Sequence, residues 1–222
     1  MKPKVILALD VDNSKKAKYF INRLYPTIKI FKVGAQLFTA CGPEVIKMIR
    51  KKGAEAFLDL KYFDIPNTVA GAVRQAVRMK VKMLTLHILG DEEMIRAALA
   101  AAKDESRRLK VKRPLLIGVT VLTSKEARFS DVLTLARIGL ECGLDGVVCS
   151  VREAELLRTK FKKRFIIVTP GIRHDKEAKF DQKRTATVSQ AIKAGSDYLV
   201  VGRPILQAAE PLKTAKEFAS GK

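Results

Sequence analysis

Residues 55–68, EAFLDLKYFDIPNT, begin as an apolar strand and end at a proline that can open a helix. Between these ends lie three charged residues, Asp59, Lys61 and Asp64, within six positions. If residues 56–61 form a strand, the side chains of Asp59 and Lys61 share one face, because side chains alternate along a strand with a period of two. Opposite charges at the end of a buried strand are unusual, and they indicate a polar site here.

Seven other apolar stretches have the same layout, each followed by a helical pattern. Strands are expected at residues 5–10, 28–34, 56–61, 83–88, 115–123, 145–150, 164–171 and 197–203, and helices at about 14–24, 43–52, 66–79, 91–109, 130–141, 151–160, 187–194 and from 204. Strands that are apolar on both faces belong to a parallel sheet covered by helices. Eight such units, with no linker between them, predict one domain over residues 1–222, a (β/α)8 TIM barrel rather than an open doubly wound sheet.

Composition excludes several classes of protein. The apolar fraction of 47% is typical of a globular chain, and the longest apolar runs are too short to span a bilayer. The first residues lead directly into a strand without a signal-peptide pattern, so we expect a cytoplasmic protein without a membrane partner. The three cysteines form no CxxC pair and are expected to be reduced, and with only two histidines a zinc site is not expected.

The net charge of +20 raises the possibility of a nucleic-acid partner. However, lysine and arginine are spread over every expected helix and alternate with acids, and the few aromatic residues form no stacking platform. A charge-rich solvated surface, as in heat-adapted proteins, is the simpler explanation, so no nucleic-acid partner is predicted. Such a surface would also attract an anionic small substrate. Salt-sensitive nucleic-acid binding without enzymatic activity would favour the alternative.

Polar residues gather where the expected strands end, which is where TIM barrels form their sites. They are Asp10, Lys32, Asp59, Lys61, His87, Thr123, Ser150, Arg173 and Arg203. Lysines and aspartates together predict a charge network rather than a nucleophilic triad, and no GxSxG, Walker or GxGxxG pattern is present. Salt bridges that merely close the barrel are the alternative, although buried ion pairs seldom add stability.

Gly202 and Arg203 follow the last strand and precede Pro204, which can open a helix. Barrels often bind phosphate at this position, through backbone N–H groups, the positive helix end and arginine. A glycine required only for close packing is the alternative. The charged loop at residues 172–183 would suit a lid over the phosphate, or it is simply a surface loop.

The motif DLKxxDIPNT at 59–68 resembles the signature of the orotidine 5′-phosphate decarboxylase family. Further segments resemble that family: PGIR (170–173), DQKR (181–184), GSDYLVVGRPI (195–205), LD (9–10), KVG (32–34) and LTS (122–124). Phe63 departs from the family pattern, since many members have histidine there. The resemblance covers nearly the whole chain and implies a homodimeric TIM barrel that converts orotidine 5′-phosphate to uridine 5′-phosphate and CO2 in pyrimidine (UMP) biosynthesis, without a metal or other cofactor.

The resemblance also implies a role for each matching residue. Lys61 would donate a proton to C6 of the pyrimidine, and Lys32, Asp59 and the partner's Asp64 would complete the catalytic charge network. Asp10 would contact the ribose, together with Thr68 from the partner subunit, and Thr123 would contact the pyrimidine. The phosphate would be bound by Arg173, Gln182, Gly202 and Arg203. Lys32 and Asp59 would also touch the substrate.

The nearest alternative lies in the same suprafamily of barrels. 3-Keto-gulonate-phosphate decarboxylases and hexulose-phosphate synthases resemble the D-x-K-x-x-D core but use a magnesium-stabilised enediolate. The following residues 65–68, IPNT, argue against them. Loss of activity in EDTA would favour this alternative.

Overall fold

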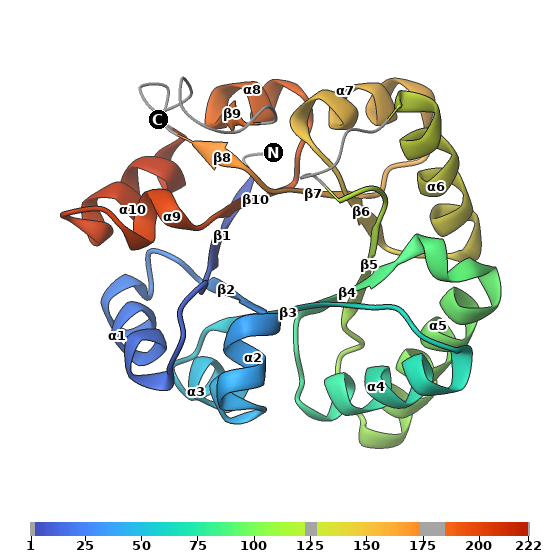
Figure 1. Cartoon of the computed structure of the whole chain (residues 1–222), viewed down its shortest axis with the longest axis horizontal. Helices are drawn as coiled ribbons and strands as arrows, with labels where there is room; N and C mark the ends of the chain where they lie inside the picture. Colours follow the sequence, from blue (N-terminus) through green and yellow to red (C-terminus); the bar gives the residue numbers. More distant parts are fainter. Residues whose placement is uncertain (1–2, 123–127, 174–184, 222) are drawn as a thin grey trace.

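Parallel strands close into a barrel, and helices surround it (Figure 1). The computed structural model describes residues 3–122, 128–173 and 185–221. The barrel strands are β1 (Lys4–Ala8), β2 (Ile30–Gly34), β3 (Glu55–Tyr62), β4 (Met83–His87), β5 (Leu115–Val119), β6 (Gly146–Val148), β7 (Ile166–Thr169) and β10 (Tyr198–Val201). They are neighbours in the order β1-β10-β7-β6-β5-β4-β3-β2. This closed parallel order confirms the prediction of a (β/α)8 TIM barrel.

The helices lie on the outside of the barrel (Figure 1). They are α1 (Ser14–Leu24), α2 (Ala35–Cys41), α3 (Glu44–Lys51), α4 (Pro66–Arg78), α5 (Asp91–Leu109), α6 (Phe129–Cys142), α7 (Val151–Lys160), α8 (Val188–Lys193), α9 (Arg203–Leu206) and α10 (Pro211–Ser220), with a 3-10 turn η1 (Ile88–Gly90). Local signals explain several boundaries. Asn13 caps α1 by accepting a hydrogen bond from Lys16 N, and Ser150 forms a capping box with Glu153 at the start of α7. Ser150 therefore stabilises a helix end.

Alternating side chains divide the core into two layers. In β1, Leu7 packs among the residues between sheet and helices, whereas Ile6 and Ala8 belong to a second cluster with Phe57 and Met83. This second cluster consists of strand residues and fills the inside of the barrel. Lys32, Asp59 and Thr85 follow on the same face, two residues further along their strands, and so lead toward the carboxyl ends of the barrel strands.

Several details differ from the sequence-based expectations, and some strands end earlier than expected. A short helix α2 follows β2 directly and ends at Gly42, which has φ 57°, one residue before Pro43. The final helix is divided into α9 and α10, because Pro211 lacks the N–H that a helix interior needs. The charged loop begins as β8 (Ile172–Arg173), which pairs with β9 (Ala186–Thr187), while residues 174–184 lie outside the described residues.

Candidate active site

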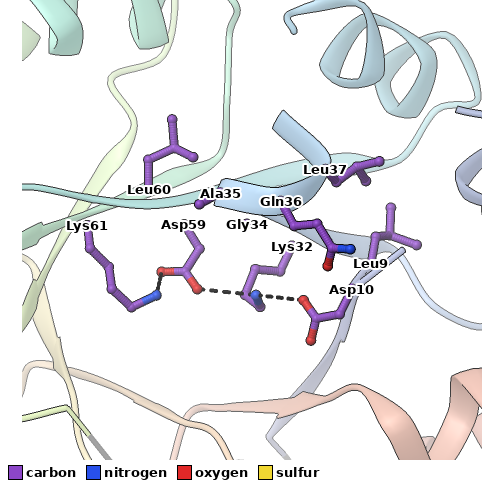
Figure 2. A pocket seen from close by; sticks show the side chains of 10 residues that line it. All are labelled: Leu9, Asp10, Lys32, Gly34, Ala35, Gln36, Leu37, Asp59, Leu60 and Lys61. Carbon is purple, nitrogen blue, oxygen red and sulfur yellow. Dashed lines mark hydrogen bonds and ion pairs between the residues drawn. The ribbon is translucent and has the colours of Figure 1, made fainter. Parts of the chain in front are cut away.

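Four charged side chains form a row of alternating sign at the carboxyl ends of three neighbouring strands (Figure 2). Lys61 Nζ lies 2.9 Å from Asp59 Oδ1, and Asp59 Oδ2 lies 3.2 Å from Lys32 Nζ. Lys32 Nζ in turn lies 3.4 Å from Asp10 Oδ1. We call Lys61, Asp59, Lys32 and Asp10 the charge row. All four were predicted as site residues, and the structure brings them together.

The strand order explains how residues so distant in the sequence meet. β2 pairs with β1 on one side and with β3 on the other, so that Lys32 lies beside Ala8 and Gly34 lies beside Asp59. Asp10 is expected on a strand but lies two residues beyond the end of β1. Because all strands are parallel, their carboxyl ends meet at one rim of the barrel. The row therefore lies where a barrel enzyme holds its substrate.

Two glycines leave room for the charge row. A Cβ atom on Gly34 would lie 3.3 Å from Lys32 Nζ, and one on Gly202 would lie 3.3 Å from Asp10 Oδ2. Both contacts are tight for a Cβ atom, so a side chain at either position would require the charged group to shift by a few tenths of an ångström. Close packing against Asp10 therefore favours glycine at position 202, in addition to the phosphate contact that the sequence predicts.

The row differs in exposure along its length. The side chain of Asp59 is 11% exposed and that of Lys32 13%, whereas Lys61 is 37% and Asp10 54% exposed. Burial raises the pKa of Asp59, but the charges of Lys32 and Lys61 and the hydrogen bonds from Lys61 and Thr85 outweigh it and lower that pKa below its usual value. Asp59 is therefore a buried carboxylate that keeps its negative charge.

Lys61 has an uncommon backbone conformation. Its φ of 51° is in the left-handed region, which costs a residue with a Cβ about 1–2 kcal/mol. The register between β3 and β4 shifts here, since Leu58 pairs with Leu84 and Tyr62 with Leu86. Asp59 and Lys61 still meet, as the sequence predicts, but on an irregular strand rather than through simple alternation. Strain of this kind is found most often at functional positions.

Thr85 is a site residue that the sequence reasoning missed. It is fully buried on β4, and its Oγ1 donates a hydrogen bond to Asp59 Oδ1 and accepts one from Lys61 N, both at 2.9 Å. One signal could have found it: in MLTLH, Thr85 alternates with Met83 and His87, so a polar residue faces the inside of the barrel. Gln36 on α2 was also missed; it lines the pocket beside the charge row.

This pocket has a volume of about 190 Å³. It is lined by the charge row together with Leu9, Gly34, Ala35, Gln36, Leu37 and Leu60. The side chains of the row point along one side of it (Figure 2). Charged groups along one side and apolar walls beside them are typical of a site for a small molecule that carries polar groups.

The residues predicted to contact phosphate lie on neighbouring parts of the rim. Gly202 caps α9, Arg203 begins it and is exposed, and Arg173 is half-buried on β8. β10, which leads into Gly202, pairs with β1, which leads into Asp10. The predicted contacts Thr123 and Gln182 lie outside the described residues.

Asp64 and Thr68 are exposed and lie outside the charge row. Asp64 Oδ1 accepts a hydrogen bond from Ile65 N at 2.7 Å, and no ion pair within the described residues joins Asp64 to Lys61. Their surroundings are unusually apolar for a surface. Phe63 is 60% exposed and Ile65 67%. The segment that follows Lys61 therefore presents an apolar surface that carries a carboxylate.

His87 lies at the end of β4, beside the charge row. Its ring centroid is 5.7 Å from that of Phe63, and its Nδ1 is buried without a hydrogen-bond partner among the described residues. Burial and the charge of Lys61 lower the pKa of His87, while Asp59 opposes them. His87 is therefore a neutral group at neutral pH.

The described part of the chain contains no cluster of three or more metal-ligating side chains. Within the same residues, no helix is long and apolar enough to cross a membrane. Fold and geometry together indicate the class of (β/α)8-barrel enzymes, with a row of alternating ammonium and carboxylate groups as the candidate active site.

Comparisons with known proteins narrow this class to one family. Residues 3–218 match the model of the orotidine 5′-phosphate decarboxylase / HUMPS family. A Coxiella burnetii protein named orotidine 5′-phosphate decarboxylase is 46% identical over 95% of this chain and 93% of its own length. A protein of the same name from Vibrio cholerae is 44% identical over 98% and 97%. The chain belongs to this family, as its motifs predicted.

A solved structure supports the same assignment. The crystal structure of orotidine 5′-phosphate decarboxylase from Lactobacillus acidophilus matches with a TM-score of 0.87 at 33% sequence identity. The match covers 99% of this chain and 98% of the other. The two folds therefore correspond over nearly the full length of both chains.

Proposed function

We propose that this protein is an orotidine 5′-phosphate decarboxylase, which converts orotidine 5′-phosphate to uridine 5′-phosphate and CO2 without a cofactor. The observation that supports it most is the charge row on the DLKxxDIPNT segment, with Lys61 2.9 Å from a buried, ionised Asp59. Relatives at 41–46% identity that cover nearly the whole chain have this name. The reaction would form UMP as a step of pyrimidine biosynthesis in the cytoplasm.

The chemistry requires stabilisation of a localised negative charge. When the bond from C6 to the carboxylate breaks, CO2 leaves and its electron pair stays on C6, in the plane of the ring, where the ring cannot delocalise it. An ammonium group held beside C6 stabilises this charge and then transfers its proton to carbon. Lys61 would do both, because it ends the charge row and is its most exposed lysine.

Asp59 and Lys32 would act on the same step from the buried side. Both oxygens of Asp59 are bound by lysines, Oδ1 by Lys61 and Oδ2 by Lys32, so the carboxylate is held before the substrate arrives. A fixed negative charge near the substrate carboxylate favours its departure as neutral CO2. Groups that need no reorganisation during the reaction give the largest electrostatic benefit.

The rest of the substrate would be bound around the rim. Asp10, at the exposed end of the row, would bind ribose hydroxyl groups together with the partner's Thr68, and Thr123 would bind the pyrimidine. Arg173, Gln182, Gly202 and Arg203 would hold the phosphate. Contacts so far from C6 lower the barrier when their binding energy helps to close and order the site.

A second subunit would complete the site. Phe63 and Ile65 are exposed apolar residues on both sides of Asp64, and Leu89 is 61% exposed. Burial of such a surface against the same surface of a second chain would form a two-fold homodimer. In that arrangement the partner's Asp64 would add a carboxylate to the Lys61 end of the charge row.

The decisive experiment measures decarboxylation of orotidine 5′-phosphate by the purified enzyme. The absorbance of the orotate ring should decrease as uridine 5′-phosphate forms, at the same rate with and without EDTA. No decrease would overturn the proposal. A reaction abolished by EDTA and restored by Mg²⁺ would instead favour the enediolate chemistry of the hexulose-phosphate branch.

Arg203→Ala should damage both kcat and KM, because a phosphate contact contributes to binding and to closure of the site. The expected loss in kcat/KM is on the order of 10²-fold, as for removal of a hydrogen bond to a charged group. Arg203→Lys should recover only part of it, since lysine lacks the bidentate fork. Arg107→Ala, on an exposed turn of α5, is the matched control and should change neither parameter. Unchanged kinetics in Arg203→Ala would exclude the phosphate contact.

A further inference from the structure

The hydroxyl group of Thr85 connects the two residues that would do the chemistry. It donates its one proton to Asp59 Oδ1 and accepts the backbone N–H of Lys61, each at 2.9 Å. Thr85 comes from β4, whereas Asp59 and Lys61 are both on β3. A single hydroxyl therefore holds a carboxylate and the backbone of the adjacent lysine from the neighbouring strand.

The position of Thr85 follows from the strand register. Phe57 of β3 pairs with Met83 of β4, and both belong to the cluster inside the barrel. Two residues further along each strand, Asp59 and Thr85 face the same interior and meet. There the regular pairing of β3 with β4 is interrupted until Tyr62, so the hydroxyl binds the Lys61 N–H at the irregular part of the strand.

The hydrogen bond from Lys61 N to Thr85 Oγ1 is made by the residue of the site whose backbone is strained. Lys61 has a left-handed backbone, with φ 51°, which other contacts must hold in place. The direction of its side chain depends on that conformation, because the Cα–Cβ bond turns with the backbone. Asp59 Oδ1 accepts hydrogen bonds from both Lys61 Nζ and Thr85 Oγ1, so its orientation also depends on the hydroxyl.

We propose that Thr85 is a positioning residue, which holds Asp59 and the backbone of Lys61 so that the Lys61 ammonium is aimed at the reacting carbon. This inference rests on the proposed function, since it assigns a purpose to the orientation of Lys61. Thr85 does not touch the substrate in this scheme; it acts through its two neighbours. A buried hydroxyl that serves only stability is the competing explanation.

Thr85→Val tests the proposal, because valine has nearly the same shape but lacks the hydroxyl. We expect kcat to fall about 10- to 100-fold, the effect of losing a hydrogen bond to a charged group, with KM changed less than about threefold. Thr85→Ser retains the hydroxyl and should keep kcat within a few-fold of the wild type. Thr169→Val is the matched control, since Thr169 is a fully buried strand threonine whose hydroxyl is bonded to Ser196; its kcat should be unchanged.

The pH dependence provides a readout that a purely structural role would not move. The charged or titratable groups around Asp59 are Lys32 on β2, Lys61 on β3 and His87 on β4, all of which Thr85→Val leaves in place. The hydrogen bond from Thr85 lowers the pKa of Asp59, so its removal should raise that pKa. If activity requires ionised Asp59, the loss of activity on acidification should then begin at a higher pH than in the wild type.

The same pKa can be measured by NMR of the Asp59 carboxyl carbon in the substrate-free protein. An upward shift in Thr85→Val together with a fall in kcat supports the proposal, and an unchanged kcat overturns it whether or not the pKa shifts. Because this measurement needs no turnover, it separates a failure of the positioning role from a failure of the proposed function. If Thr85→Val does not fold, Thr85→Ala and Thr85→Ser are compared instead. Equal losses of kcat in alanine and serine would also overturn the proposal.

Discussion

Lys61→Ala is expected to lower kcat by about 10⁴-fold or more while the protein still binds uridine 5′-phosphate. The estimate combines about 10²–10⁴ for proton donation with about 10²–10³ for electrostatic stabilisation of developing charge. Nucleotide binding should persist, because the predicted contacts of ribose and phosphate come from other residues. Lys61→Ala also removes one ion pair of Asp59, but Lys32 still neutralises that carboxylate from Oδ2.

The measurement pairs steady-state kinetics with calorimetric binding of uridine 5′-phosphate. Lys47→Ala is the matched control: Lys47 also forms an ion pair, 2.6 Å from Glu44, but on the outer surface of α3. It should retain the kcat of the wild type. Turnover by Lys61→Ala within tenfold of the wild type would refute both roles of Lys61. Loss of nucleotide binding as well would show that the side chain serves ground-state binding instead.

Mixing two inactive variants should restore activity if Asp64 acts in the partner's site. Lys61→Ala and Asp64→Asn homodimers should each be nearly inactive. In a hybrid dimer, the subunit with native Lys61 faces the partner's native Asp64, so one of the two sites is complete. Random exchange of equal amounts should therefore restore about a quarter of the wild-type activity, as expected for a two-fold symmetric dimer.

A second mixture tests the opposite prediction. Lys61→Ala mixed with Asp59→Asn should remain inactive, because Asp59 and Lys61 lie 2.9 Å apart in one chain and serve one site. Subunits are exchanged by dilution and reconcentration, and hybrid dimers are isolated with two different affinity tags before the assay. Absence of recovery in verified Lys61→Ala/Asp64→Asn hybrids would contradict the shared site. Recovery in the Lys61→Ala/Asp59→Asn mixture would contradict the assignment of both residues to one subunit.

Much of the fold could be predicted because its signals are local. Each of the eight strands is a short apolar stretch between turn and helix signals, and all eight are present in the barrel. Helix α2 was missed because it is only seven residues long, follows a strand directly and has no side-chain cap. The division of the last helix had a visible signal in Pro211, which was not used.

The site could be predicted only in part. Asp59 and Lys61 were found together because they are two residues apart on one strand, a relation that depends on covalent sequence alone. Lys32 and Asp10 were placed at the same rim by the general geometry of barrels, but the order of the charges was not predicted. That order follows from which strands are neighbours and how far each extends.

For residues 55–68, the sequence alone determined a strand that carries a pair of opposite charges and a family signature. Tertiary structure decided the rest. The pairing of β3 with β2 joins Asp59 to Lys32, and its shifted register with β4 joins Asp59 and Lys61 to Thr85. Such contacts join residues about 25 positions apart, and they form only when the barrel closes and aligns its strands. Local patterns identify the candidate reacting groups, whereas the contacts that hold and orient them depend on neighbouring strands.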